Sequence, residues 1–242
     1  MKPIATETQF LDRLVLLDKP RDVTSFQALS PLKKDLGSSL GHTGTLDRFA
    51  DGLLVILTGH LTKLVPLLTE MDKVYEAVFE FGRQTDTLDP EGQVILERAV
   101  PTRDRLEETL KRFQGDLLQV PPLFSAVHVN GKRAYKRALA GESPEIPPRH
   151  VKIHAFEMLH WEAPYARVRI HCSKGTYVRA LARYWAESSD SAATVTQLRR
   201  LQVGPFVVPR VGREDWNVRR VFETLQIPVF KVKEPLLARR GV

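Results

Sequence analysis

The stretch "GHTGTLD" (Gly41–Asp47) stands shortly before the apolar run "LLVIL" (Leu53–Leu57). Its two glycines allow positive φ angles and close approach of another backbone or a ligand. The histidine and threonines between them surround Asp47 with hydrogen-bonding groups. The apolar run has the length and composition of a buried strand. We therefore expect a small, pliable loop that presents one carboxylate and leads into the core.

Two kinds of ligand site that use such loops lack part of their pattern here. The Lys-Ser/Thr pair of a phosphate-binding loop is missing, and a carboxylate at the end of the loop would repel phosphate. A metal site would have only His42 and Asp47, with no spaced third or fourth ligand. From the residues alone, a tight turn whose aspartate caps the next segment stays open as an alternative.

The charge of the chain indicates an anionic partner. Among 242 residues, 36 Lys and Arg face 29 Asp and Glu, which gives a formal net charge of +7. Such an imbalance attracts polyanions, nucleic acids among them, although a basic protein without such a partner is the alternative. The single cysteine, Cys172, excludes an internal disulfide and a thiolate zinc site, and it favours a reducing cytoplasm.

No targeting or membrane signal is expected from the sequence. The first 13 residues contain acids and lack the apolar core of a signal peptide. The longest apolar run, Leu53–Leu57, is far too short to cross a bilayer. We expect a soluble cytoplasmic protein with no membrane partner, acting as a monomer.

The hydrophobic patterns predict a mixture of strands and helices without regular βαβα alternation. Strands are expected at residues 14–20, 53–57, 73–82, 152–159 and 166–172. Helices are expected at 24–37, with Thr24 as the N-cap, at 61–71, at 102–115 and from the turn at 173–176 onward. In the strand at 73–82, Val74, Ala77 and Phe79 are expected near the core. The stretch "TDTLDPEGQV" has hairpin or loop chemistry. The order predicts an α+β fold with a mainly antiparallel sheet flanked by helices.

Five motifs occur in an order and spacing that closely resemble the TruB family, the bacterial tRNA pseudouridine-55 synthases. They are "LLDKP" (16–20), "GHTGTLD" with "GLLVILTGHLTKL" (41–64), "KVYEAVFEFGRQTDTLD" (73–89), "KGTYVRALAR" (174–183) and "QLRRLQVGPF" (197–206). The resemblance implies a pseudouridine synthase fold. It also implies an isomerase that converts uridine 55 in the T-loop of tRNA to pseudouridine, without cofactor or metal.

The resemblance also implies roles for individual residues. Asp47 corresponds to the catalytic aspartate, and Arg179 to the arginine that pairs with it. Tyr75 corresponds to the aromatic residue that stacks on the target base and whose hydroxyl assists proton transfer at C5, with a strand tyrosine packed in the core as the alternative. Tyr177 matches a second aromatic near the base, and we expect it in extended or helix-entry backbone together with Arg179, because residues two apart on a helix do not share a face.

Further positions match the family's RNA-binding elements. His42 resembles the histidine that enters the space left by the flipped base, with a loop-bracing histidine as the alternative. Leu201 corresponds to an apolar wall of the uracil pocket, although it would also suit the core. Lys19, with Pro20, is expected to support the active-site loop. The proline-rich segment 120–150 is expected to leave the core, with only its middle helical. It is expected to clasp RNA through Lys132, Arg133, Lys136 and Arg137, with ordinary solvated charge as the alternative.

The sequence departs from the family at two places. The aspartate is followed by "RFADG" where the family usually has proline next, and we hypothesise that Arg48 and Asp51 form an ion pair that restores rigidity. We assign residues 1–209 to a catalytic domain and 210–242 to a short basic extension, too short for a full PUA domain. An RNA chaperone that refolds tRNA, or a synthase for a different uridine, are the alternative functions.

Overall fold

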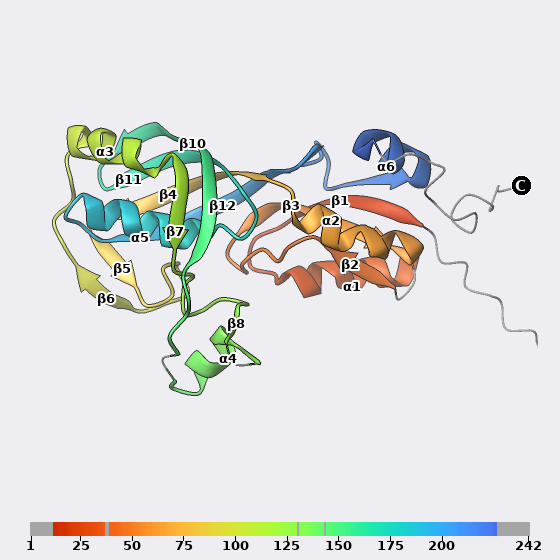
Figure 1. The fold of residues 1–242 in the computed structure, drawn as a ribbon, viewed down its shortest axis with the longest axis horizontal. Helices are drawn as coiled ribbons and strands as arrows, with labels where there is room; N and C mark the ends of the chain where they lie inside the picture. The colour runs from red at the N-terminus through yellow and green to blue at the C-terminus, as the bar shows by residue number, and fades with distance from the viewer. Residues whose placement is uncertain (1–11, 37–38, 130, 143, 227–242) are drawn as a thin grey trace, which may run out of the picture. The chain divides into compact units, whose positions relative to one another are not determined.

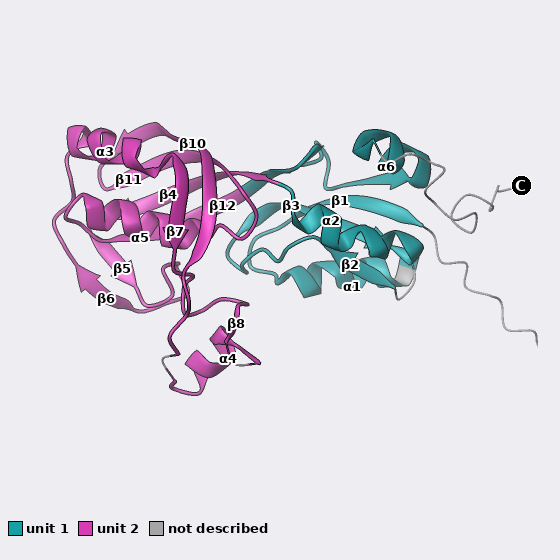
Figure 2. Ribbon diagram, in the orientation of Figure 1, with its two compact units in different colours: residues 1–71, 200–242 teal, residues 72–199 magenta. Residues whose placement is uncertain are grey.

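The computed structural model (Figure 1) describes residues 12–36, 39–129, 131–142 and 144–226. The chain forms two compact units, residues 1–71 with 200–242 and residues 72–199 (Figure 2). Strand β12 (Ala193–Val203) belongs to both units, because the boundary at residue 200 falls inside it. No helix in the described ranges combines the length and apolarity that a membrane crossing requires.

Unit 1 is built on a sheet in the order β14–β1–β3–β12, in which β1 pairs antiparallel with both β14 and β3. Within the described residues of this unit, its other elements are two further short strands and four helical segments. The bounds are β1 (Arg13–Lys19), α1 (Ser25–Leu36), β2 (Leu40–His42), β3 (Asp51–Thr58), η1 (Gly59–Leu64), α2 (Val65–Thr69), β13 (Phe206–Val207), β14 (Arg213–Asn217) and α6 (Val218–Leu225).

The apolar run at 53–57 is buried on both faces of this sheet. Leu53, Val55 and Leu57 pack into a cluster that includes residues of α2 and α6. Leu54 and Ile56 pack on the opposite face with leucines of α1. A strand covered on both faces needs apolar residues at every position, which explains why this segment shows a continuous apolar run and no alternation.

Helix α1 begins at the predicted cap. The Thr24 hydroxyl accepts a hydrogen bond from the Gln27 amide at 3.1 Å, and the Gln27 side-chain oxygen accepts one from the Thr24 amide at 2.8 Å. This reciprocal pair is a capping box, which satisfies two amides at the helix start. The helix continues past Pro31 to Leu36. The predicted end at Gly37 lies outside the described residues.

Unit 2 is a sheet in the order β12–β4–β11–β10–β7, and its β4–β11, β11–β10 and β10–β7 pairs are antiparallel. The predicted mainly antiparallel α+β architecture is therefore confirmed. The bounds are β4 (Lys73–Phe81), β5 (Arg83–Thr85), β6 (Val94–Glu97), α3 (Arg103–Leu110), η2 (Lys111–Phe113), β7 (Gly115–Gln119), β8 (His128–Val129), β9 (Lys132–Arg133), α4 (Ala134–Leu139), β10 (Arg149–Glu162), β11 (Tyr165–Cys172) and α5 (Val178–Ser188).

An aromatic cluster joins α5 to the inner face of the unit 2 sheet. Trp185 of α5 makes edge contacts with Phe79, Phe81 and Phe156, at centroid distances of 5.2 to 6.1 Å. The Trp185 indole donates to the Leu106 carbonyl of α3 at 3.2 Å, so its polar end is satisfied inside the core. The side chain therefore fixes both helices against one face.

The prediction for β4 was wrong at one position. Val74 is only partly buried, whereas Tyr75, Ala77 and Phe79 form the buried face of the strand. Side chains alternate between the faces of a strand, so Val74 cannot share a face with Ala77 and Phe79. Tyr75 is thus on the inner side of the sheet, opposite Ile170 of β11.

Segment 120–150 leaves the sheet as predicted. It contains the β8–β9 hairpin and helix α4, which Figure 1 shows extending from the rest of unit 2 on two connecting segments. Helix α4 occupies only the middle of the segment. The region after residue 210 forms β14, an edge strand of the unit 1 sheet, and then α6, and the basic tail beyond residue 226 lies outside the described residues.

We predict that Gly52→Ala destabilises the protein. Gly52 has φ +101°, and a Cβ there would overlap the carbonyl oxygen of Arg200 on β12. A strained backbone of this kind costs about 1–3 kcal/mol before the clash is added. Thermal unfolding should show Tm lowered by roughly 2–12 °C, because 1 kcal/mol shifts Tm by about 2–4 °C in a chain of this size. The control is Gly212→Ala, where no atom of the described part of the chain lies within 4 Å of the added carbon and Tm should stay unchanged. Equal Tm values for the two variants would contradict the prediction.

Candidate active site

The loop between β2 and β3 carries Asp47 in unit 1, and it is held on the N-terminal side by a buried serine. The Ser25 hydroxyl accepts a hydrogen bond from the Leu46 amide at 2.9 Å and donates to the Leu46 carbonyl at 3.2 Å. Ser25 is the first residue of α1 and is buried. Both backbone groups of the residue before Asp47 are therefore fixed by one side chain.

On the other side of Asp47, a buried lysine holds the backbone of Arg48. The Lys19 ammonium donates to the carbonyls of Pro20 at 2.9 Å, Val23 at 2.8 Å and Arg48 at 3.4 Å. The Arg48 carbonyl also accepts from the Asp22 amide at 3.0 Å. Lys19 thus links the turn after β1 to the loop with Asp47.

Opposing effects act on the charge of Lys19, and burial is the largest of them. Burial lowers the pKa of Lys19, while the carboxylates of Asp51, Asp47 and Asp22 oppose this shift and the charge of Arg200 adds to it. Removal from water disfavours an ammonium, and nearby carboxylates favour it. The interaction with Asp47 places a positive charge in the electrostatic surroundings of the proposed catalytic group.

Arg200 is a second buried cation that holds the loop, and our reading of the sequence missed it. Its Nε donates to the Leu53 carbonyl at 2.7 Å and its Nη2 to the Gly44 carbonyl at 3.1 Å. Gly44 has φ +117°, so the loop uses the conformational freedom predicted for its glycines. The signal that was available is the position of Arg200 in the motif "QLRRLQVGPF".

His42 ends β2 and is partly buried at the start of the loop. Burial and, to a smaller extent, the charge of Arg200 lower the pKa of His42, against a contact with the Gly44 backbone that raises it. These surroundings favour the neutral imidazole, which already predominates at pH 7 at the unperturbed pKa of about 6.5.

The residues that depart from the family pattern make specific contacts. Asp51 forms an ion pair with Arg21 at 2.9 Å. The Arg48 guanidinium donates to the Asp22 carbonyl at 3.2 Å. These contacts tie both residues to the turn after β1, and the hypothesised Arg48–Asp51 pair stays a prediction.

In unit 2, Arg179 is buried in the first turn of α5. Its guanidinium forms an ion pair with Asp89 at 3.0 Å and donates to the carbonyls of Thr87 at 2.8 Å and Phe124 at 3.0 Å. Asp89 is also buried and was missed as a site residue, although it lies in the quoted stretch "TDTLD". The pairing of Arg179 with Asp47 expected from the resemblance stays a prediction.

The two aromatic residues expected near the base come from different parts of unit 2. Tyr75 lies on β4 and is 8% exposed. Tyr177 is the residue before α5, with extended backbone, and its amide and carbonyl both bond the side chain of buried Gln119, at 2.8 and 3.2 Å. The expectation that Tyr177 and Arg179 stand at a helix entry is therefore confirmed.

The remaining predicted site residues lie on strands. Leu201 is partly buried on β12 in unit 1, where its carbonyl accepts from the Val208 amide at 2.9 Å. Lys132 and Arg133 form β9 and are both exposed in the hairpin with β8. On the following helix, α4, Arg137 forms an ion pair with Glu142 at 2.6 Å.

Solved structures first define the class of fold. The chain is similar to the structure titled "Crystal Structure of a Cbf5-Nop10-Gar1 Complex", with a TM-score of 0.63, 27% identity and coverage of 82% of this chain and 50% of that one. A structure of an H/ACA RNP bound to a substrate RNA, at 23% identity and a TM-score of 0.61, shares the fold. The architecture is that of a pseudouridine synthase.

Sequence comparison then gives the family. The model of the TruB family pseudouridylate synthase N-terminal domain matches residues 33–178. The chain is 43% identical over 196 residues to tRNA pseudouridine synthase B of Borreliella burgdorferi, covering 79% of this chain and 70% of that protein. The chain belongs to the TruB family.

Other relatives support the same family over different shares of their length. tRNA pseudouridine synthase B of Stutzerimonas stutzeri is 44% identical over 195 residues, covering 80% of this chain and 64% of that protein. The enzyme of Treponema denticola is 43% identical over 209 residues, covering 78% and 58%. The chain thus spans between about half and 70% of the proteins it matches.

We predict that acidification destabilises the wild type more than His42→Asn. Because the pKa of His42 is lowered in the folded state, the unfolded chain binds a proton first as the pH falls below about 6.5. The contribution of His42 to the free energy of unfolding is therefore lost as the pH falls from about 6.5 toward the lower pKa of the folded state. This contribution is fully present at pH values well above 6.5. Urea unfolding at pH 7.0 and 5.0 measures this, and an equal loss in both proteins would contradict it.

Proposed function

We propose that this protein converts uridine 55 in the T-loop of tRNA to pseudouridine, with Asp47 as the catalytic carboxylate. Membership of the TruB family and the names of the relatives support tRNA as substrate. The observation that carries the role of Asp47 is its placement between two backbone segments held by Ser25 and Lys19. Such anchoring holds the backbone on both sides of the carboxylate, and catalysis requires a reacting group that is held in position.

The reaction breaks the bond between N1 of uracil and the ribose C1′, turns the base, and joins C5 to C1′. The C5 proton is lost and N1 gains one, so the product is an isomer of the substrate. Asp47 either attacks C1′ as a nucleophile or removes a ribose proton to give a glycal-type intermediate, and both routes need an ionised carboxylate. The base must recombine before water reaches the sugar carbon.

Arg179 and Tyr75 complete the proposed catalytic set. Arg179 is proposed to orient Asp47 and keep it ionised through a charge-assisted hydrogen bond. Its own position is supported by Asp89 and two carbonyls, which makes Asp89 a positioning residue. Tyr75 is proposed to stack on the uracil, with its hydroxyl assisting proton transfer at C5.

Substrate binding is proposed to begin with extrusion of the uridine from the T-loop, which costs a few kcal/mol of lost stacking. His42, neutral at pH 7, would fill the vacated space. Tyr177 and Leu201 would contact the base, and Lys19 would hold the loop with Asp47. The exposed Lys132 and Arg133 would contact phosphates from the hairpin.

The proposed substrate also fixes the expected place and form of action. Bacterial tRNA is in the cytoplasm, and we propose that the protein acts there. The roles above are assigned to residues of one chain, so we propose a monomer that needs no cofactor and no metal for the reaction.

We predict that Asp47→Asn abolishes pseudouridine formation. The amide neither attacks C1′ nor accepts a proton, so the rate should fall at least about 1,000-fold. Unmodified tRNA is incubated with each protein and pseudouridine is mapped by chemical probing at single-nucleotide resolution. Asp104→Asn, on the exposed side of α3, is the matched control and should keep the wild-type rate.

The same experiment separates the alternatives. No product from the wild type, combined with tRNA refolding that survives in Asp47→Asn, would replace the proposal by an RNA chaperone. Product at another position would mean a synthase for a different uridine. Product at position 55 from Asp47→Asn at the wild-type rate would remove Asp47 from the mechanism.

We predict that Lys132→Ala with Arg133→Ala weakens the salt dependence of tRNA binding. Two lost phosphate contacts should make the slope of log K against log salt about 1.5 less negative. Filter binding between 50 and 300 mM salt measures the slope. The control is Lys111→Ala with Arg112→Ala, the same pair of residue types exposed on η2. An unchanged slope in the hairpin variant, or the same change in both variants, would contradict phosphate binding by the hairpin.

A further inference from the structure

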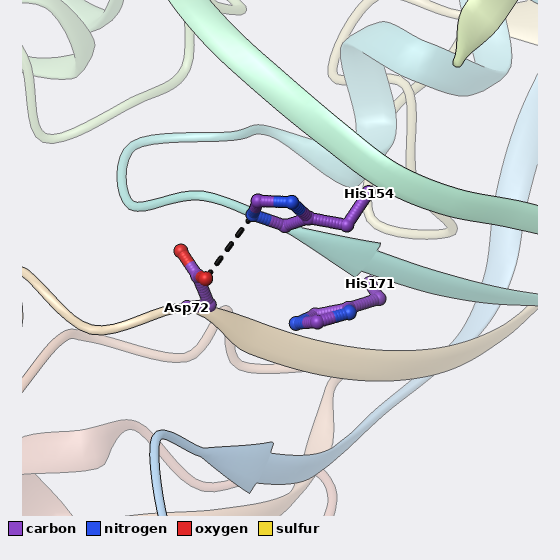
Figure 3. A group of neighbouring side chains, drawn as sticks. All are labelled: Asp72, His154 and His171. Atoms are coloured by element: carbon purple, nitrogen blue, oxygen red, sulfur yellow. Dashed lines mark ion pairs between the residues drawn. The ribbon is translucent and has the colours of Figure 1, made fainter. Parts of the chain in front are cut away.

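Three side chains of unit 2 that have no part in the proposed function lie close together. Asp72, His154 and His171 each place one ligand-type atom within 4.8 Å of the others. His154 Nε2 lies 3.1 Å from Asp72 Oδ2, and the two imidazole rings have centroids 4.6 Å apart. Figure 3 shows the Asp72 and His154 side chains pointing toward each other, with the His171 ring beside them.

Strand pairing brings these residues together. Asp72 directly precedes β4, and His171 on β11 pairs with Val74 of that strand. On β10, the register against β11 shifts between Ile153 and Ala155, so His154 is the extra residue of a bulge. A bulge redirects the side chain at its position, and here it turns His154 toward the neighbouring strands.

The close approach of His154 and Asp72 is not explained by a well-formed hydrogen bond. His154 Nε2 is shielded from solvent, and among the residues that the structure describes it has no hydrogen-bond partner of acceptable geometry, although the carboxylate oxygen is 3.1 Å away. Two electron-rich atoms at this distance repel unless a positive charge lies between them. A proton on His154 Nε2 would form only a weak hydrogen bond with the carboxylate, because hydrogen bonds weaken steeply when donor, proton and acceptor are not in line. A metal ion bound by both atoms would satisfy them.

We propose that Asp72, His154 and His171 bind a Zn²⁺ ion. Zinc takes imidazole nitrogen at about 2.0–2.1 Å and carboxylate oxygen at about 2.0–2.2 Å in tetrahedral geometry, which separates neighbouring ligand atoms by about 3.4 Å. The His154–Asp72 distance already lies near this value. All three residues are partly exposed, so the His171 side chain has room to close the remaining gap.

The type and number of ligands select the ion. Two imidazoles and one carboxylate suit Zn²⁺, whereas Mg²⁺ and Ca²⁺ prefer sites made of oxygen atoms. Cys172 follows His171 in the chain but is buried on the opposite face of β11, so it is no fourth ligand. The fourth position is left to water or to an external ligand, as in open zinc sites.

The test is metal binding to the purified full chain after removal of metals with a chelator. Zn²⁺ titration by calorimetry should give one saturable site, and Co²⁺ in its place should give visible absorption bands of tetrahedral nitrogen and oxygen ligation. His154→Asn and His171→Asn should each weaken Zn²⁺ binding more than about 100-fold, because even outer-shell changes cost about 10- to 100-fold. Asp72→Asn should weaken it in the same direction.

The matched control is His160→Asn. His160 is also on β10 and lies near a carboxylate, 3.8 Å from Glu162, but it is outside the cluster. Its loss should leave the affinity within about threefold of the wild type. The absence of saturable binding by the wild type, or equal affinity in the wild type and the two cluster histidine variants, would overturn the proposal.

A second measurement does not depend on the folding of any variant. In the wild type, imidazole nitrogen NMR should show two histidine side chains shifting on addition of one equivalent of Zn²⁺, with the other five of the seven unchanged. Assignment of the shifts to residues other than His154 and His171 would overturn the proposal. These readouts follow the metal and not pseudouridine formation, so they stand apart from the proposed function.

Discussion

The buried ammonium of Lys19 is the interaction on which the candidate site of unit 1 depends. A charge removed from water is unfavourable by several kcal/mol unless its protons are satisfied. Lys19 satisfies them with carbonyls from the turn after β1 and from the loop that carries Asp47. Neither segment has regular secondary structure of its own, so the lysine supplies a link that backbone pairing does not provide. The carboxylate of Asp47 is thereby placed near a cation that does not need it as a hydrogen-bond partner.

The same arrangement occurs at two arginines. Arg200 binds the Leu53 and Gly44 carbonyls in unit 1, and Arg179 binds the Thr87 and Phe124 carbonyls together with Asp89 in unit 2. Irregular loops leave carbonyl groups without ladder partners, and a guanidinium presents several donors in a fixed plane. Each arginine therefore holds at least two chain segments at once. Replacement by lysine would not be conservative at these positions, because one ammonium does not reproduce the planar fork.

Local pattern was sufficient for the elements and for much of the site. The continuous apolar run at 53–57, the Thr24 cap and the periodicity of α3 were read correctly because neighbours along the chain determine them. Family motifs then placed Tyr177 at a helix entry. The prediction that Val74 lies near the core was wrong, because the two-residue period of a strand places it on the opposite face from Ala77 and Phe79.

The parts that sequence did not predict depend on distant partners. Nothing in the neighbouring sequence distinguishes Asp89 from the other acids of its turn. It becomes a site residue because it pairs with Arg179, which lies on a helix 90 positions further along the chain. Arg200 acts through carbonyls 147 and 156 positions away. Strand β14 is only five residues long, and it exists because β1 offers an edge with which to pair. Long-range contacts of this kind leave no trace in periodicity or composition.

The net charge of +7 is a weaker guide to an RNA surface than the places where the charges lie. On the outward face of the unit 2 sheet, Glu76 accepts from Arg167 at 2.7 Å and Arg169 at 2.6 Å. These hydrogen bonds lower the pKa of Glu76, so the carboxylate stays ionised and offsets the arginines. Phosphate would have to compete with it there. Lys132 and Arg133, by contrast, are adjacent and exposed on a short hairpin that extends from the sheet, where a polyanion can approach from several sides. Position in the fold, and not the sum of charges, is therefore the stronger physical argument for the hairpin as an RNA contact.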